Sequence, residues 1–172
     1  MESGRSVLIS QEKLHLRVQE LAAEILQEEV PDVLVGVLTG AFVFAADLAR
    51  ALALPELEIQ FVKASSYGNG MEHSAFRVNG LDELDLSGKK VLLVDDILDS
   101  GHTLKNLSLA IAEQGAQSVK TCVLLDKPAR REVSVSADYS GFSVANEFVV
   151  GYGLDYAGKF RSLPEICTIK KR

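Results

Sequence analysis

The sequence predicts an α/β fold in which a central, mainly parallel and twisted sheet is flanked by helices. Segments with a helical period of apolar residues alternate along the chain with short apolar runs typical of strands. The runs at 33–38, 89–94 and 118–126 show little or no polar alternation, as expected for strands buried on both faces. This alternating order favours helices packed on a parallel sheet.

The first half of the chain predicts two helices and two strands. Residues 10–27 repeat apolar residues on one helical face, and Ser10 stands where an N-cap is expected. The first buried strand is followed by a turn at 39–40 and by a second helix at 41–52. Residues 57–62 alternate apolar and polar side chains, which predicts a strand with one exposed face.

Residues 63–80 predict a long loop, because they are rich in Ser, Gly and Asn and show little periodicity. A loop of this length inside a compact domain is typical of a lid or a binding loop. We place a flexible lid at about residues 64–80.

The second half begins with the buried strand at 89–94 and predicts one helix and three further strands after it. The helix covers 103–114, and Gly115 supplies a C-cap signal. The strand at 118–126 follows, then a short one at 148–153 and an edge strand at 165–170. Because the 172 residues contain no repeat and no linker, we expect a single domain over 1–172.

Composition and charge exclude several classes of function. The net charge is −6 and the basic stretches at 127–131 and 170–172 are short, which argues against nucleic acid as a partner. The sequence has no apolar run long enough to cross a bilayer and no secretory pattern, so no membrane partner is expected. Cys122 and Cys167 form no CxxC motif, which fits a cytoplasmic protein.

Acidic and hydroxyl side chains gather at 95–103, between a strand end and a helix start. Ser100, Gly101 and Thr103 can offer N–H groups and hydroxyls at the helix N-terminus, which predicts a phosphate site. The stretch lacks the GxxxxGK[ST] pattern of a P-loop. Together with the turn at 39–40 and the residues 126–127, it falls at the carboxyl ends of strands, where α/β sheets bind ligands.

Asp95 and Asp96 precede this phosphate site, although carboxylates repel an anion. They could accept hydrogen bonds from sugar hydroxyls, or hold Mg²⁺ together with substrate phosphates. A ligand that carries a ribose and phosphates would use both features. Asp99 would face the middle of such a ligand, where it could accept a proton or stabilise a cationic sugar carbon. The alternative interpretation is a solvated turn with an N-cap.

The stretch VLLVDDILDSGHTL, residues 91–104, resembles the phosphoribosyl diphosphate signature of the type I phosphoribosyltransferases. The stretches LTGAFVFAADLAR, KASSYG, LLDKPARR and GFSVANEFVVGYGLDYAGKFR resemble the hypoxanthine/guanine members, particularly bacterial ones. The resemblance covers most of the chain, from Leu38 to Arg161. It implies the type I fold, with a small hood built from the N-terminal and C-terminal segments.

The resemblance also implies a reaction. A 5-phosphoribosyl group moves from phosphoribosyl diphosphate to N9 of hypoxanthine or guanine, which gives IMP or GMP plus diphosphate. It implies Mg²⁺ as the cofactor, with Asp95, Asp96 and Asp155 as ligands, and a homodimer or homotetramer. Two alternatives stay open: a phosphoribosyltransferase that prefers xanthine, and a non-catalytic regulator that binds phosphoribosyl diphosphate.

The site residues follow from the resemblance, with Asp99 as the catalytic proton acceptor for purine N7. The phosphoribosyl group is expected at Asp95, Asp96, Ile97, Asp99, Ser100, Gly101, His102 and Thr103. The diphosphate is expected at Thr39, Gly40, Ser66, Tyr67 and Arg161, with Ser66 and Tyr67 on the lid. The purine is expected at Ile97, Lys127, Phe148, Val149 and Asp155.

Two of these positions also have a direct chemical reading. The Lys127 ammonium is a donor, which suits a 6-oxopurine and disfavours a 6-aminopurine. Relatives often carry a basic residue in place of Thr39, and they bind diphosphate through main-chain amides of this turn. In the family this turn often contains a non-proline cis peptide bond, so the resemblance predicts one at Leu38–Thr39. Many relatives have glutamate in place of Asp95, so the reach of this carboxylate is shorter here.

Overall fold

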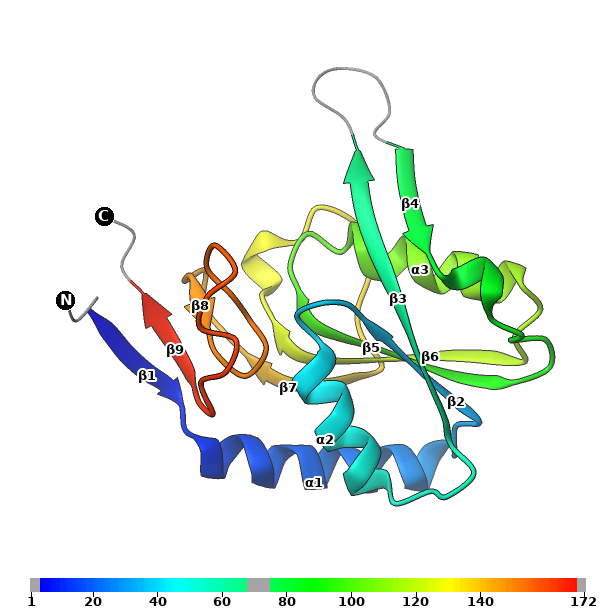
Figure 1. Ribbon diagram of the computed structural model, residues 1–172, viewed down its shortest axis with the longest axis horizontal. Helices are drawn as coiled ribbons and strands as arrows, with labels where there is room; N and C mark the ends of the chain where they lie inside the picture. The colour runs from blue at the N-terminus through cyan, green and yellow to red at the C-terminus, as the bar shows by residue number, and fades with distance from the viewer. Residues whose placement is uncertain (1–3, 68–74, 170–172) are drawn as a thin grey trace.

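The described chain, residues 4–67 and 75–169 of a computed structural model, forms two sheets and three α-helices (Figure 1). Among these residues, none of the helices combines the length and hydrophobicity that crossing a membrane requires. The elements in chain order are β1 (Arg5–Ile9), α1 (Gln11–Glu28), β2 (Val33–Val37), α2 (Phe42–Leu52), β3 (Glu58–Tyr67), β4 (Ala75–Asn79), the 3₁₀ turn η1 (Leu81–Glu83), β5 (Lys90–Leu98), α3 (His102–Glu113), β6 (Ser118–Asp126), the 3₁₀ turn η2 (Pro128–Arg130), β7 (Tyr139–Ser143), β8 (Val149–Val150) and β9 (Ile166–Ile169).

The larger sheet has the strand order β4-β3-β2-β5-β6-β7, and all of its neighbouring pairs are parallel except β3 and β4. Its two faces have separate cores, because successive strand residues point to opposite faces. Leu34 packs in one core with α1 and α2, whereas Val33 and Val35 pack in the other with α3. The predicted α/β arrangement of a mainly parallel sheet between helices is confirmed.

The smaller sheet joins the two ends of the described chain in the order β1-β9-β8, and both of its pairs are antiparallel (Figure 1). β1 was not predicted from the sequence. The strand predicted at 165–170 is confirmed as β9, but its predicted edge position was wrong, because β9 lies between β1 and β8. The strand predicted at 148–153 is limited to the two residues of β8.

The long loop predicted at 63–80 is wrong for its described parts, since β3 continues to Tyr67 and pairs with β4 from Ala75 onward. Lys63 faces Asn79 and Ser65 faces Arg77 in this antiparallel pair. Cross-strand hydrogen bonds join main-chain groups and therefore need no apolar alternation in the sequence. The lid residues 68–74 lie outside the described residues, and the lid itself stays a prediction.

Strand β5 also extends further than its apolar run, and this extension positions the site. Its pairing with β2 ends at Val94, whereas its pairing with β6 continues to Leu98. Asp95 and Asp96 therefore belong to the strand and not to the loop after it, which corrects the sequence prediction. Because β2 ends at Val37 and its chain turns away, the sheet opens on that side of the two aspartates.

Candidate functional site

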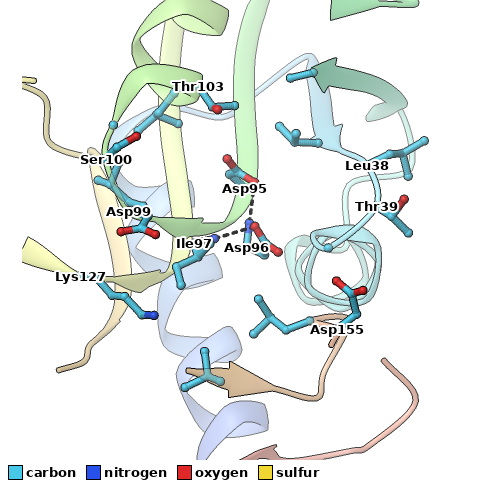
Figure 2. A pocket seen from close by; sticks show the side chains of 18 of the residues that line it. Leu38, Thr39, Asp95, Asp96, Ile97, Asp99, Ser100, Thr103, Lys127 and Asp155 are labelled. Carbon is cyan, nitrogen blue, oxygen red and sulfur yellow. Dashed lines mark hydrogen bonds between the residues drawn. The ribbon is translucent and has the colours of Figure 1, made fainter. Parts of the chain in front are cut away.

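A pocket of about 510 Å³ lies at this opening, beyond the carboxyl ends of β2, β5 and β6. Figure 2 shows acidic and hydroxyl side chains from β5 and from the turn before α3, with the Lys127 ammonium at another edge. Most residues of the predicted site line this pocket together. They are Thr39, Gly40, Asp95, Asp96, Ile97, Asp99, Ser100, Gly101, Thr103, Lys127, Phe148, Val149, Asp155 and Arg161.

Three predicted residues are not among the described lining residues. The exposed side chain of His102 bonds to the Glu132 carboxylate, with 3.1 Å between Nε2 and Oε2. Ser66 and Tyr67 lie on β3, opposite Phe76 and Ala75, and their side chains are outside the described part. The structure therefore tests only the main-chain position of these two residues.

The lining also contains apolar residues that sequence reasoning did not select: Val37, Leu38, Ala64, Leu98, Leu104 and Leu154. Their signal in the sequence is that of ordinary core residues, so only the fold separates them from the rest of the core. The Leu38–Thr39 peptide bond at the pocket wall is cis, as predicted.

Asp95 and Asp96 place two adjacent carboxylates near the end of β5. Asp95 is 7% exposed, and its Oδ1 accepts a hydrogen bond of 2.9 Å from the Asp96 N–H. Oδ1 of Asp96 accepts one of 2.8 Å from the N–H of Ile97 (Figure 2). Burial raises the pKa of Asp95 well above its usual range, and the charge of Asp96 adds to this rise. Burial also raises the pKa of Asp96, while the Arg161 charge opposes that shift.

Asp99 follows β5 and faces two arginines of the LLDKPARR stretch. Arg130 Nε donates to Asp99 Oδ1 at 3.0 Å, and both side chains remain partly exposed. The Arg131 guanidinium donates to the main-chain oxygen of Asp99 at 2.9 Å and also bonds to the Asp126 carboxylate. These arginines were not among the predicted site residues, although they stand three and four residues after Lys127.

The predicted phosphate turn leads directly into α3, a helix of 12 residues. Gly101 is the N-cap, and it has no side chain to occupy the first N–H groups of the helix. The main-chain oxygen of Ser100 accepts a hydrogen bond of 2.9 Å from the Glu132 N–H, which ties the turn to the segment after β6. The helix N-terminus, Ser100 and Thr103 thus present donors suited to a phosphate group.

The predicted purine side of the pocket contains a buried cation and an aromatic ring. Lys127 is 7% exposed, and its ammonium donates to the main-chain oxygen of Glu147 at 2.6 Å. Burial lowers the pKa of Lys127, while the charge of Asp99 acts in the opposite direction. The half-buried ring of Phe148 packs edge-to-face against Tyr156, with 5.5 Å between ring centroids.

Asp155 and Arg161 form an ion pair of 3.1 Å on the wall next to the 39–40 turn. Arg161 Nη1 also donates to the main-chain oxygen of Gly153 at 2.7 Å. The second carboxylate oxygen of Asp155 accepts a 2.7 Å hydrogen bond from the Gly158 N–H. Asp155 is thus held by partners in its own loop, residues 153–161, which is distant in sequence from Asp95 and Asp96.

The donor set fits Mg²⁺ that is bound partly through its substrate. No group of three or more His, Cys, Asp or Glu side chains suited to a metal ion occurs among the described residues. Mg²⁺ needs no such group, because it usually takes one or two carboxylates together with water and substrate phosphates. Asp95 and Asp96 offer hard oxygen atoms beside the phosphate turn.

The raised pKa values of Asp95 and Asp96 predict an unusual pH dependence of stability. Since burial raises both pKa values, the folded protein binds more protons than the unfolded chain above about pH 4. The free energy of unfolding therefore falls as pH rises through this window. We expect Asp95→Asn to raise Tm by about 2–4 °C at pH 8 and to lose this advantage near pH 4.

The measurement is thermal unfolding of both proteins from pH 4 to pH 8 with a metal chelator present. Asp82→Asn, at an exposed aspartate of η1, is the matched control and should follow the wild type. An Asp95→Asn variant that is less stable than the wild type at pH 8 would contradict a raised pKa of Asp95 in the folded protein.

Comparison with known proteins agrees with the site. The chain matches the phosphoribosyl transferase domain family over residues 8–157. A hypoxanthine phosphoribosyltransferase of Salmonella typhimurium is 43% identical over 172 residues, which cover 96% of each protein. A hypoxanthine-guanine phosphoribosyltransferase of Aquifex aeolicus is 45% identical over 169 residues, which cover 95% of this chain and 94% of the relative.

Solved structures give the same result. A hypoxanthine-guanine phosphoribosyltransferase of Bacillus anthracis, with HEPES in its active site, has a TM-score of 0.83 at 41% identity and covers 96% of this chain and 98% of its own. A hypoxanthine phosphoribosyltransferase of Staphylococcus aureus has a TM-score of 0.87 at 36% identity and covers 96% of this chain and 91% of its own. The chain therefore has the type I phosphoribosyltransferase fold and belongs to the phosphoribosyltransferase family, within its hypoxanthine/guanine group.

Proposed function

We propose that this protein transfers a 5-phosphoribosyl group from phosphoribosyl diphosphate to N9 of hypoxanthine or guanine, forming IMP or GMP and releasing diphosphate. One observation supports this most: a single pocket joins a turn at a helix N-terminus, two adjacent carboxylates of which Asp95 is buried, and the buried ammonium of Lys127. These groups suit the 5′-phosphate, the ribose hydroxyls and a 6-oxo group, in that order along the ligand.

The phosphoribosyl diphosphate is held by groups from three segments. Main-chain N–H groups at Ser100–Thr103 bind the 5′-phosphate, and Asp95 and Asp96 bind the ribose hydroxyls directly or through Mg²⁺. The turn at 39–40 and Arg161 bind the diphosphate. Mg²⁺, when bound by Asp95, Asp96 or Asp155, neutralises phosphate charge and so makes diphosphate a better leaving group.

The purine lies between Lys127 and Phe148. The Lys127 ammonium has three N–H donors and uses one on the Glu147 oxygen, so others remain for the 6-oxo group. The ring of Phe148 stacks on the base, and the main chain of Val149 reads its edge. A 6-amino group would meet a donor with another donor, so adenine is a poor substrate.

Asp99 accepts the proton of purine N7 while N9 bonds to C1′ of the ribose. The bond between C1′ and the diphosphate oxygen breaks, and its electron pair leaves with the diphosphate. The sugar carbon carries positive charge in the transition state, and the nearby carboxylates of Asp95 and Asp99 stabilise it. Arg130 shares the Asp99 carboxylate and orients it.

A spectrophotometric assay with phosphoribosyl diphosphate and Mg²⁺ tests the proposal, with hypoxanthine, guanine, xanthine and adenine offered in parallel. We expect turnover of hypoxanthine or guanine, poor turnover of adenine, and loss of activity on chelation of Mg²⁺. Preference for xanthine would identify the alternative transferase. Binding of phosphoribosyl diphosphate without turnover of any base would identify a non-catalytic regulator.

We also propose a cytoplasmic location and a homodimer or homotetramer. Cys122 and Cys167 are buried free thiols, which suits a reducing compartment. Phe42 at the start of α2 is 39% exposed, and an exposed aromatic ring beside the site is a feature of surfaces that pair with another subunit.

A further inference from the structure

The loop that contains Asp155 and Arg161 is attached to α2 by a hydrogen bond that the proposed reaction does not use. Tyr152 is 7% exposed, and its hydroxyl donates to the carboxylate of Asp47 on α2. Asp47 also pairs with Arg50, whose side chain is 79% exposed. Tyr152 therefore joins two segments that are more than 100 residues apart in the sequence.

A second contact between the same segments lies next to the pocket. Gly153 has a φ of +100°, and a Cβ added to it would lie 2.4 Å from the main-chain oxygen of Gly40. The main chain of Gly153 therefore rests directly on the 39–40 turn. Gly153 also binds Arg161 twice, since its oxygen accepts from Nη1 at 2.7 Å and its N–H donates to the Arg161 oxygen at 2.9 Å.

The loop packs in part against the core, to which Tyr152 and Leu154 belong, and in part borders a cavity. A second cavity of about 910 Å³ lies between α1, α2 and the segment 161–164, and Tyr152, Asp47 and Arg161 all line it. Since a cavity supplies few contacts, specific bonds carry more of the task of holding the loop. The Tyr152–Asp47 hydrogen bond lies in the wall of this cavity.

We propose that Tyr152 is a positioning residue that holds Arg161 and the 39–40 turn at a fixed separation, so that both meet the diphosphate. The helix α2 starts directly after this turn, and Asp47 lies on it. The Tyr152–Asp47 bond fixes the loop to the helix, the Gly153–Gly40 contact sets the spacing, and Gly153 orients Arg161. This inference rests on the proposed function, because that function places diphosphate between these two segments.

Tyr152→Phe removes the hydroxyl and keeps the ring in place. We expect KM for phosphoribosyl diphosphate, and Kd for diphosphate with Mg²⁺ by calorimetry, to rise about tenfold. KM for hypoxanthine should stay at the wild-type value, because Lys127 and Phe148 do not contact this bond. Equal effects on both KM values, or no effect on either, would overturn the inference.

Changes at Asp47 separate positioning from a purely structural role. Asp47→Asn keeps an oxygen acceptor for the Tyr152 hydroxyl, so this variant should retain nearly wild-type KM values. Asp47→Ala should reproduce the Tyr152→Phe effect, and the double variant should be no worse than either single one. Arg50→Ala and Tyr139→Phe are matched controls. Arg50→Ala removes the second partner of Asp47, and Tyr139→Phe removes the hydroxyl of a buried tyrosine on β7. Neither change should alter KM for phosphoribosyl diphosphate.

The two proposals fail in different ways. If the wild type turns over no purine but binds diphosphate, the proposed function fails, and the calorimetric comparison of the Tyr152 and Asp47 variants still tests the positioning role. If the wild type does not bind diphosphate with Mg²⁺ at all, the positioning role fails as well. Wild-type turnover with variants that bind diphosphate normally overturns the positioning role alone.

Discussion

Asp99→Asn is expected to lower kcat by about 10²-fold or more while KM for phosphoribosyl diphosphate changes little. Asparagine keeps the size of the side chain and can still accept the Arg130 hydrogen bond that holds it at the pocket wall. It cannot take up the N7 proton, and it carries no negative charge to stabilise the cationic sugar carbon. The loss should therefore appear in the chemical step and not in binding.

Single-turnover kinetics with hypoxanthine, together with calorimetric binding of IMP, would separate these steps. Asp82→Asn makes the same chemical change at an exposed site that does not line the pocket, and it should behave as the wild type. Unchanged turnover in Asp99→Asn would remove Asp99 as the proton acceptor. Loss of IMP binding as well would indicate that Asp99 mainly shapes the pocket.

Gly40→Ala is expected to lower kcat/KM for phosphoribosyl diphosphate by about 10²-fold. A Cβ at this position would lie 1.7 Å from Oδ2 of Asp96, a distance that no pair of non-bonded heavy atoms tolerates. Either the turn or the Asp96 carboxylate must move, and both line the pocket, where we assign the turn to the diphosphate and Asp96 to the ribose hydroxyls. A displacement of about 1 Å at a positioning group is enough for a loss of this size.

Steady-state kinetics with varied phosphoribosyl diphosphate at saturating hypoxanthine would measure the effect. Gly4→Ala is the matched control, because nothing lies within 4 Å of a Cβ added there. KM for hypoxanthine should change much less than KM for phosphoribosyl diphosphate in Gly40→Ala. Wild-type kcat/KM in this variant would mean that the Asp96 carboxylate does not need its present place for catalysis.

Local patterns in the sequence were sufficient for the fold class and for selecting the acidic and hydroxyl residues at 95–103 that line the pocket. The apolar runs of β2, β5 and β6 identify strands buried on both faces, and Leu14, Val18 and Leu21 identify the buried face of α1. The acids and the phosphate turn of 95–103 lie next to one another in the chain, so their common role can be read locally. The cis peptide bond at Leu38–Thr39 followed from the resemblance and not from any physical pattern.

Long-range pairing decided what these patterns could not. β3 and β4 pair through their main chains, and β9 lies between β1 and β8, so neither arrangement leaves a periodic signal in the side chains. His102 stands in the phosphate turn by sequence, yet its side chain bonds to Glu132, whose place depends on the path of the chain after β6. The direction in which the His102 side chain points is therefore set by a partner distant in sequence.

The sequence by itself determined that this protein has a mainly parallel α/β core and a Ser-Gly-His-Thr turn beside acidic residues at a helix start, because periodicity and helix boundaries are properties of neighbouring residues. Only the tertiary structure decided that Asp96 lies against Gly40, that Arg131 holds the main chain at Asp99, and that Tyr152 bonds to Asp47. Each of these contacts joins segments separated by 30 residues or more, and it exists only after the sheet has brought the strand ends together.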